Sequence, residues 1–184
     1  MNKSPAGTRT GAATVAGRTR EIAVVAVLIA IGAVLRMFTP NVAGITPNFV
    51  IAMYCLSILL IRPGVSGALG IGIVGGAVCM LFSKSPIPYL NLISEPAGAL
   101  ACAILARYMP ELAVGNYAFK PAVATVIGTL VSGLTYITLN FTVALNMPFA
   151  AWVTALVSVV IPVAVINAVL AQILYLPAKR ILRF

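Results

Sequence analysis

The sequence predicts an all-α integral membrane protein, from its composition, its long apolar segments and the placement of its basic residues. Of its 184 residues, 61% are hydrophobic and only 8% are charged. A soluble domain typically carries about 25% charged residues. With so few charged side chains the chain cannot cover itself with a water-facing surface, so its apolar segments are expected to lie in a lipid bilayer.

Six apolar segments follow a polar and basic N-terminal stretch. Most reach the length of about 17 to 25 residues that crosses a bilayer as a helix. The second is short, so it needs neighbouring residues, a thinned bilayer or a protein-lined region. Barrel strands are excluded because the segments lack an apolar and polar alternation with period two. The segments cover residues 22–38, 49–61, 65–82, 92–108, 121–145 and 149–176.

The stretch "MNKSPAGTRTGAATVAGRTR" at residues 1–20 is small, polar and basic. It predicts a flexible cytoplasmic tail, followed by a six-helix membrane domain over residues 21–184. A cleaved signal peptide is the rival interpretation. It is disfavoured because the next segment is long and ends in "VLRMF", without a small-residue cleavage site.

Lysine and arginine set the expected orientation, because short cytoplasmic loops carry an excess of them. With the N-terminus inside, only Arg36 and Lys84 of the twelve basic residues lie outside. We therefore expect both termini in the cytoplasm and "SKSPIPYLNLISEP", residues 83–96, as the second outer loop. The basic residues expected inside are Lys3, Arg9, Arg18, Arg20, Arg62, Arg107, Lys120, Lys179, Arg180 and Arg183.

The fifth segment carries a polar row of Thr125, Thr129, Ser132, Tyr136 and Asn140. Steps of three and four residues keep this row on one helical face, which must then face the bundle interior or a cavity. Bonding to the helix backbone is the favoured account for the two threonines. Asn140 has more hydrogen-bonding groups than its own backbone can satisfy, which makes it and Tyr136 candidates for ligand contact.

The sixth segment begins near Trp152, which is either an interfacial anchor or a stacking surface for a flat ligand. Both interpretations stay open. Asn167 and Gln172 lie towards the cytoplasm, and we expect them to join helices.

Small residues gather in two segments. Segment three carries Gly67, Gly70, Gly72, Gly75 and Gly76, which favours close packing inside the bundle. Segment one carries four alanines on one face, and this smooth strip could equally meet another subunit or lipid. The alanines are Ala23, Ala26, Ala30 and Ala33.

Several kinds of chemistry find no support in the sequence. A phosphate-binding GxxxxGK[ST] motif and histidine are both absent, which argues against P-loop ATP hydrolysis, His-based catalysis and a His-based metal site. The three cysteines sit singly in apolar runs and are expected to be buried hydrophobes. Glu95 is the one acid expected near the membrane's outer side, which disfavours an enzyme and a stand-alone gradient-driven transporter. A substrate-binding membrane subunit powered by a partner fits these facts.

The chain resembles the tryptophan-transporter (TrpP-like) family of S components from energy-coupling factor (ECF) transporters. The similar stretches are "AVLIAIGAVLRMFTP", "GITPNFVIAM", "SPIPYLNLISEPAGAL", "VIGTLVSGLTYI", "VVIPVAVINAVL" and "ILYLPAKRILR". Their order and spacing, more than any single motif, carry the resemblance.

The resemblance implies a six-helix protein of the bacterial cell membrane that binds its solute from outside. It implies docking, through Ala26 and Ala30 with Ala23 and Ala33 beside them, onto a transmembrane coupling subunit with two cytosolic ATPases. ATP would be used by these partners, and no cofactor or metal is expected in this chain. In the first outer loop, Thr46 and Asn48 stand where the family tends to carry charged residues.

The resemblance also suggests roles around an outer pocket for tryptophan or a related aromatic solute. Glu95 would pair with an ammonium group, and Lys84 or Arg36 with a carboxylate. The rival interpretation pairs Glu95 with Lys84, or makes it an N-terminal helix charge. The expected substrate-binding residues are Glu95, Asn91, Asn140, Trp152, Tyr136, Lys84, Tyr89, Asn48, Thr46 and Arg36.

Two alternatives to this function stay open. The chain could be an S component for another micronutrient, such as a vitamin or a nucleobase-like compound. It could also be a small membrane scaffold without a solute of its own, in which case the alanine and glycine faces would be its working parts.

Overall fold

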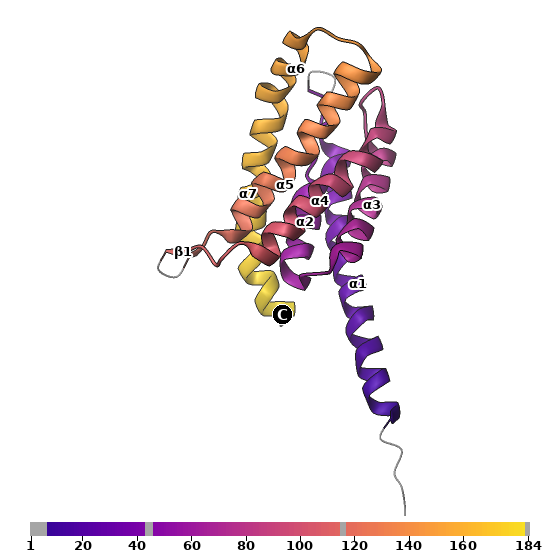
Figure 1. Ribbon diagram of the computed structural model, residues 1–184, viewed down its shortest axis with the longest axis vertical. Helices are drawn as coiled ribbons and strands as arrows, with labels where there is room; N and C mark the ends of the chain where they lie inside the picture. The colour runs from indigo at the N-terminus through magenta and orange to yellow at the C-terminus, as the bar shows by residue number, and fades with distance from the viewer. Residues whose placement is uncertain (1–6, 43–45, 115–116, 183–184) are drawn as a thin grey trace, which may run out of the picture.

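The computed structural model describes residues 7–42, 46–114 and 117–182 as a helical bundle (Figure 1). The segments η2 and η3 are π-helical turns that continue α5 and α6, and η1 is a 3-10 turn before α4. The elements are α1 (Gly7–Phe38), α2 (Val50–Ile61), α3 (Val65–Phe82), η1 (Pro88–Leu90), α4 (Asn91–Tyr108), β1 (Ala113–Val114), β2 (Tyr117–Ala118), α5 (Lys120–Ile137), η2 (Thr138–Ala144), α6 (Phe149–Ala155), η3 (Leu156–Val160) and α7 (Ile161–Leu182).

Five helical stretches of the described chain are long and apolar enough to cross a membrane, and α2 adds a shorter apolar helix. The prediction of an all-α, six-helix membrane bundle is therefore confirmed. Two short strands, β1 and β2, form a small antiparallel hairpin between α4 and α5. The five stretches are Gly17–Phe38, Val65–Phe82, Pro88–Tyr108, Lys120–Ala144 and Phe149–Leu182.

Helix α2 lies at the centre of the bundle and packs against α1, α3, α4, α5 and α7. Its twelve residues span roughly 18 Å at 1.5 Å per residue, and all of residues 50–60 are buried. A helix surrounded by other helices does not have to match the lipid thickness. The short second segment is thus explained by a protein-lined environment.

Helix α1 begins at Gly7, within the stretch that the sequence favoured as a flexible tail. Residues 7–20 continue the first helix, and residues 1–6 lie outside the described residues. Figure 1 shows the first turns of α1 extending below the bundle, at the same end as the C-terminal end of α7. The start of α1 and the end of α7 therefore lie on one side of the bundle.

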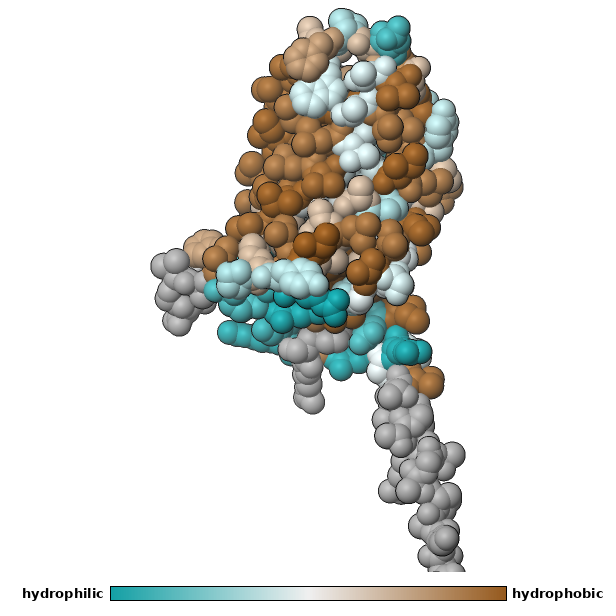
Figure 2. Space-filling model, viewed as in Figure 1, coloured by the Kyte–Doolittle hydropathy of each residue, from teal (hydrophilic) through white to brown (hydrophobic). Residues whose placement is uncertain are grey.

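The surface is divided along this axis. Figure 2 shows a broad apolar surface over the bundle and a hydrophilic band at the end where α7 finishes. The C-terminal ends of α2, α4 and α7 carry exposed Arg62, Arg107, Lys179 and Arg180. By the excess of basic residues inside, this end is the one expected to face the cytoplasm.

Glycines set the spacing of α3, α4 and α5. A Cβ added at Gly72 would lie 2.6 Å from the Pro96 backbone, and one at Gly98 would lie 2.7 Å from the carbonyl oxygen of Gly128. These helices can approach so closely only without side chains at the contact. The predicted internal packing of Gly72 and its partner Gly76 is confirmed, and it fixes the position of α4, which carries Glu95.

The alanine strip of α1 has a different environment. Ala23, Ala26 and Ala30 are exposed on the isolated chain, and Ala33 is half-buried. The strip is thus largely free of contact with the other described helices.

Candidate functional site

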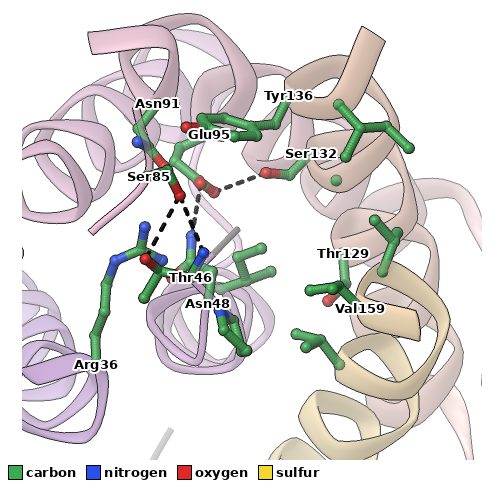
Figure 3. A pocket seen from close by; sticks show the side chains of 16 residues that line it. Arg36, Thr46, Asn48, Ser85, Asn91, Glu95, Thr129, Ser132, Tyr136 and Val159 are labelled. Carbon is green, nitrogen blue, oxygen red and sulfur yellow. Dashed lines mark hydrogen bonds between the residues drawn. The ribbon is translucent and has the colours of Figure 1, made fainter. Parts of the chain in front are cut away.

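A cavity lies in the half of the bundle away from the two chain ends, between α1, α2, α4, α5, η3 and α7 (Figure 3). One side is polar, and the other is mostly apolar. The polar lining consists of Arg36, Thr46, Asn48, Ser85, Asn91, Glu95, Thr129, Ser132 and Tyr136. The apolar lining consists of Pro47, Ile51, Gly133, Ile137, Val159, Val160 and Val163.

Glu95 projects from α4 and is only 2% exposed. Its Oε1 accepts a hydrogen bond of 2.6 Å from Nδ2 of Asn48. Its Oε2 accepts bonds from the hydroxyls of Ser132 at 2.9 Å and Tyr54 at 3.1 Å. An ionised carboxylate offers about four acceptor positions. Three neutral donors therefore leave acceptor capacity at Oε1 for one further donor.

Three further hydrogen bonds fix Asn48 in the position from which it donates to this carboxylate. Its Oδ1 accepts from the backbone N–H of Val50 at 3.1 Å, which satisfies one of the free donors at the start of α2. The same oxygen accepts from the thiol of Cys79 at 3.3 Å. The backbone carbonyl of Asn48 accepts from Nδ2 of Asn167 at 3.0 Å. The amide of Asn48 is thus held with its N–H pointing at Glu95.

Arg36, in the last turn of α1, lies on the same cavity and is also 2% exposed. Within the described residues, its Nε and Nη1 have no hydrogen-bond partner. A buried guanidinium is costly unless its charge and its donors are satisfied. The unpaired donors of Arg36 therefore lie at the cavity without an acceptor from the described residues.

Arg36 and Glu95 do not pair with each other. The ion pairs of the described chain join Glu111 to Arg62 and to Lys120, away from this cavity. The cavity consequently presents a cation and an anion separately. This arrangement can receive a solute that carries both charges, such as the carboxylate and ammonium groups of an amino acid.

The apolar side of the cavity comes from α5, η3 and α7. Val160 packs closely onto α5 at Gly133, where an added Cβ would lie 2.6 Å from Val160 Cγ1. Ile137, Val159 and Val160 belong to one buried apolar cluster. A hydrophobic side chain attached to a charged head group would find its matching surface here.

The cavity has a volume of about 40 Å³. A buried water needs roughly 10 to 15 Å³ of such space, so about three waters would fill it. A solute as large as an aromatic amino acid can occupy this site only if its walls separate.

Comparison with known proteins identifies the family. The family model described as "Tryptophan transporter TrpP" matches residues 18–183. The chain belongs to the TrpP family. A "Probable tryptophan transport protein" of Bacillus subtilis (strain 168) is 34% identical over 171 residues, which cover 90% of this chain and 94% of the relative.

A second relative supports the same membership. A "Probable tryptophan transport protein" of Clostridium acetobutylicum is 24% identical over 166 residues, which cover 89% of this chain and 94% of the relative. No solved structure matches the chain significantly. Membership of the TrpP family, together with the helices long enough to cross a membrane, makes the chain a multi-pass membrane protein of a transporter family.

In this TrpP-family protein, the cavity brings together six of the ten residues expected to bind substrate. They come from the end of α1, the segment before α2, the start and middle of α4, and α5. Their contact with a solute stays a prediction. The six residues are Arg36, Thr46, Asn48, Asn91, Glu95 and Tyr136.

The other four expected residues lie outside the lining. Lys84 donates from Nζ to the carbonyl oxygens of Met37 at 3.3 Å and Thr39 at 2.9 Å, which closes the end of α1 and leaves no ion pair with Glu95. Tyr89 is 60% exposed on η1.

Trp152 and Asn140 have surroundings of their own. Trp152 stacks on Phe149 with ring centroids 5.6 Å apart and donates from Nε1 to the hydroxyl of Thr138 at 3.1 Å. Asn140 is fully buried in η2, and neither atom of its side-chain amide has a partner among the described residues. Sequence spacing predicts its burial correctly but not its distance from the cavity.

Sequence reasoning missed several polar residues of the site. Ser85 accepts from the backbone N–H of Thr46 at 3.0 Å and so ties the two outer loops together. Ser132 donates to Glu95 instead of to its own helix backbone. Thr129 accepts from Asn167 at 3.2 Å. The polar row of α5 gave the signal for the last two, because steps of four residues from Tyr136 to Ser132 and three from Ser132 to Thr129 keep them on the face of Tyr136.

Proposed function

We propose that this protein is the substrate-binding S component of an ECF-type importer in the bacterial cell membrane. It captures tryptophan, or a closely related aromatic amino acid, from the outside. Family membership supports the solute class, since both relatives bear the printed name of probable tryptophan transport proteins. The chain is a carrier of solute and performs no chemical step of its own.

The observation that carries the proposal is the presence of Arg36 and Glu95, both buried and unpaired with each other, on one cavity. The carboxylate of an amino acid would accept hydrogen bonds from Nε and Nη1 of Arg36. Its ammonium group would donate to the remaining acceptor position at Oε1 of Glu95. Hydrogen bonds to charged groups contribute about 1.5–3 kcal/mol each, so these two contacts account for tight and selective recognition of the head group.

The apolar side of the cavity would receive the aromatic side chain. Burying apolar surface contributes about 25 cal/mol per Å², and an aromatic side chain buries about 150–250 Å². The small volume of the cavity implies that its walls move apart as the solute enters. A solute trapped by reclosure would be shielded from water, which strengthens both charged contacts.

Energy for release would come from partner subunits, namely a transmembrane coupling subunit and two cytosolic ATPases. The exposed alanine strip of α1 is the proposed docking face. Ala26→Trp should then prevent co-purification of the coupling subunit and the ATPases. The matched control is Ile31→Trp, at a position that is also exposed on α1 but off the alanine strip; equal co-purification of both variants would contradict docking at this face.

The direct test of solute binding is calorimetric titration of the purified full-length chain in detergent or nanodiscs. Tryptophan should bind with a stoichiometry of one, and glycine, which has the head group alone, should bind far more weakly. Tight binding of a vitamin or a nucleobase-like compound without tryptophan binding would replace the amino acid by another micronutrient. No solute binding at all would favour a membrane scaffold.

A further inference from the structure

Thr129 is a hydroxyl residue at the apolar end of the cavity. Figure 3 shows it beside Val159 and across the cavity from Arg36. Thr129 is only 2% exposed. The charged end of the cavity has several polar neighbours, but this end is otherwise formed by aliphatic side chains. A lone hydroxyl among them therefore marks a position where a neutral polar atom of the solute can be recognised.

The orientation of Thr129 is set by Asn167 of α7. Nδ2 of Asn167 donates both to the hydroxyl oxygen of Thr129 at 3.2 Å and to the backbone carbonyl of Asn48 at 3.0 Å. A carbonyl oxygen can only accept, so the amide of Asn167 must turn its nitrogen towards this pair. The hydroxyl oxygen of Thr129 has two lone pairs, and Asn167 occupies one of them. One acceptor position stays free on an oxygen that lines the cavity.

The other hydroxyls that α5 presents to the cavity are engaged elsewhere. Ser132 donates to Glu95 at 2.9 Å, and Tyr136 donates to the carbonyl oxygen of Ile87 at 3.1 Å. The Ser132 hydroxyl therefore belongs to the charged end, and the Tyr136 hydroxyl contacts the outer loop. Thr129 is left as the α5 hydroxyl that faces the place of an apolar side chain.

We propose that Thr129 accepts a hydrogen bond from the N–H of an indole ring, and that this contact favours tryptophan over aromatic solutes without a ring donor. The inference rests on the proposed function, because it places the amino-acid head group at Arg36 and Glu95. Tryptophan carries its charges at one end and a single neutral donor within its apolar side chain. The cavity has the complementary order, with charges at one end and a single free hydroxyl acceptor among aliphatic side chains.

A buried hydroxyl discriminates between solutes with and without a matching donor, because a solute without the donor leaves the hydroxyl unpaired. Phenylalanine lacks this donor. So does the tryptophan analogue 3-benzothienylalanine, in which sulfur replaces the indole N–H at nearly unchanged shape. The analogue therefore isolates the hydrogen bond from ring size.

The test is a pair of calorimetric titrations, with tryptophan and with 3-benzothienylalanine, on the full-length protein and on Thr129→Val. The wild-type protein should prefer tryptophan by about 3- to 10-fold, the size of one net hydrogen bond. Thr129→Val, which keeps the side-chain shape, should bind both compounds with equal affinity. Thr129→Ser, which keeps the hydroxyl, should retain the preference.

The outcomes separate this inference from the proposed function. If the wild-type protein binds both compounds equally well, or if Thr129→Val keeps the preference, the role of Thr129 is overturned while amino-acid binding stands. If the wild-type protein binds neither compound, the proposed function and the inference fall together. If Thr129→Val does not fold, equal binding of the two compounds by the wild-type protein still overturns the role of Thr129.

Discussion

Two clusters of charged residues in this protein follow opposite rules. At the end of the bundle where the chain ends emerge, Glu111 accepts from Arg62 at 2.7 Å and from Lys120 at 3.2 Å. The side chains of Arg62 and Glu111 are 52% and 57% exposed, whereas that of Lys120 is only 6% exposed and also donates to the carbonyl oxygen of Met109. In the opposite half, Arg36 and Glu95 are buried, face the same cavity and have no ionic partner among the described residues.

The difference indicates which charged groups would be stabilised by a bound solute. Exposed ion pairs contribute about 0–1 kcal/mol, because water and salt already satisfy the charges. Buried charges without a partner reduce stability, and a solute that satisfies them recovers this free energy. The Glu111 cluster thus closes a loop between α2, α4 and α5, while Arg36 and Glu95 are the two residues that we propose to bind the solute.

Neutralising the buried acid should have the largest effect. Glu95→Gln removes the charge that would meet an ammonium group, so tryptophan affinity should fall by about 10- to 150-fold, equivalent to about 1.5–3 kcal/mol. Calorimetric titration measures this change. Glu111→Gln is the matched control and should bind tryptophan like the wild-type protein. Unchanged affinity of Glu95→Gln would remove Glu95 from the site.

A substitution that disturbs the packing around Glu95 should have the next largest effect. Gly98→Ala places a Cβ 2.7 Å from Ser132 Cβ and from the hydroxyl of Tyr54, two groups that surround the carboxylate. Overpacking of this kind typically costs about 1–3 kcal/mol, so both the free energy of unfolding and tryptophan affinity should fall. Thermal unfolding in detergent, together with titration, reads out the two effects.

Gly70→Ala provides the control for this substitution, because a Cβ at Gly70 meets nothing within 4 Å. Its melting temperature and its tryptophan affinity should match those of the wild-type protein. Equal destabilisation by the two substitutions would show that the close contact between α4 and α5 does not hold the site.

Substitution of Glu111 should have the smallest effect. Partial burial tends to raise the pKa of Glu111, but the hydrogen bond and charge of Lys120, and then those of Arg62, outweigh it and hold this pKa below its ordinary value. A lowered carboxyl pKa stabilises the folded state above the ordinary pKa, and this stabilisation is lost as the pH falls through the folded-state pKa.

Glu111→Gln should therefore lower the free energy of unfolding by less than about 1 kcal/mol at pH 7. The difference from the wild-type protein should vanish in acid and shrink in high salt. Thermal unfolding at pH 7 and near pH 3 measures both. A larger loss at low pH than at pH 7 would contradict the assigned direction of the pKa shift.

The helices could be predicted from the sequence because lipid imposes one rule on every residue of a spanning segment. The start of α1 could not be predicted so well. Small polar residues before Glu21 indicate a tail when they are judged by composition alone, although helix begins at Gly7. The short length of α2 was compatible with a protein-lined position, but only the packing of the other helices around it distinguishes this from a thinned bilayer.

The site was predictable where helical spacing fixes a side-chain direction. Ile29, Gly32 and Arg36 follow one another by three and four residues, and all are buried, so this spacing could have distinguished Arg36 from Lys84. Lys84 lies in a loop, where spacing gives no direction for the side chain. Tyr54 was missed because a tyrosine within an apolar run gives no sign of which acceptor its hydroxyl meets.

The proposed contact between Arg36 and the carboxylate of the solute is tested most directly with tryptamine. This compound is tryptophan without the carboxylate. Calorimetric titrations with both compounds should be made on the wild-type protein and on Arg36→Gln. We predict that the wild-type protein prefers tryptophan by about 10-fold or more, and that Arg36→Gln binds the two compounds within about threefold of each other. An undiminished preference for tryptophan in Arg36→Gln would contradict the claim.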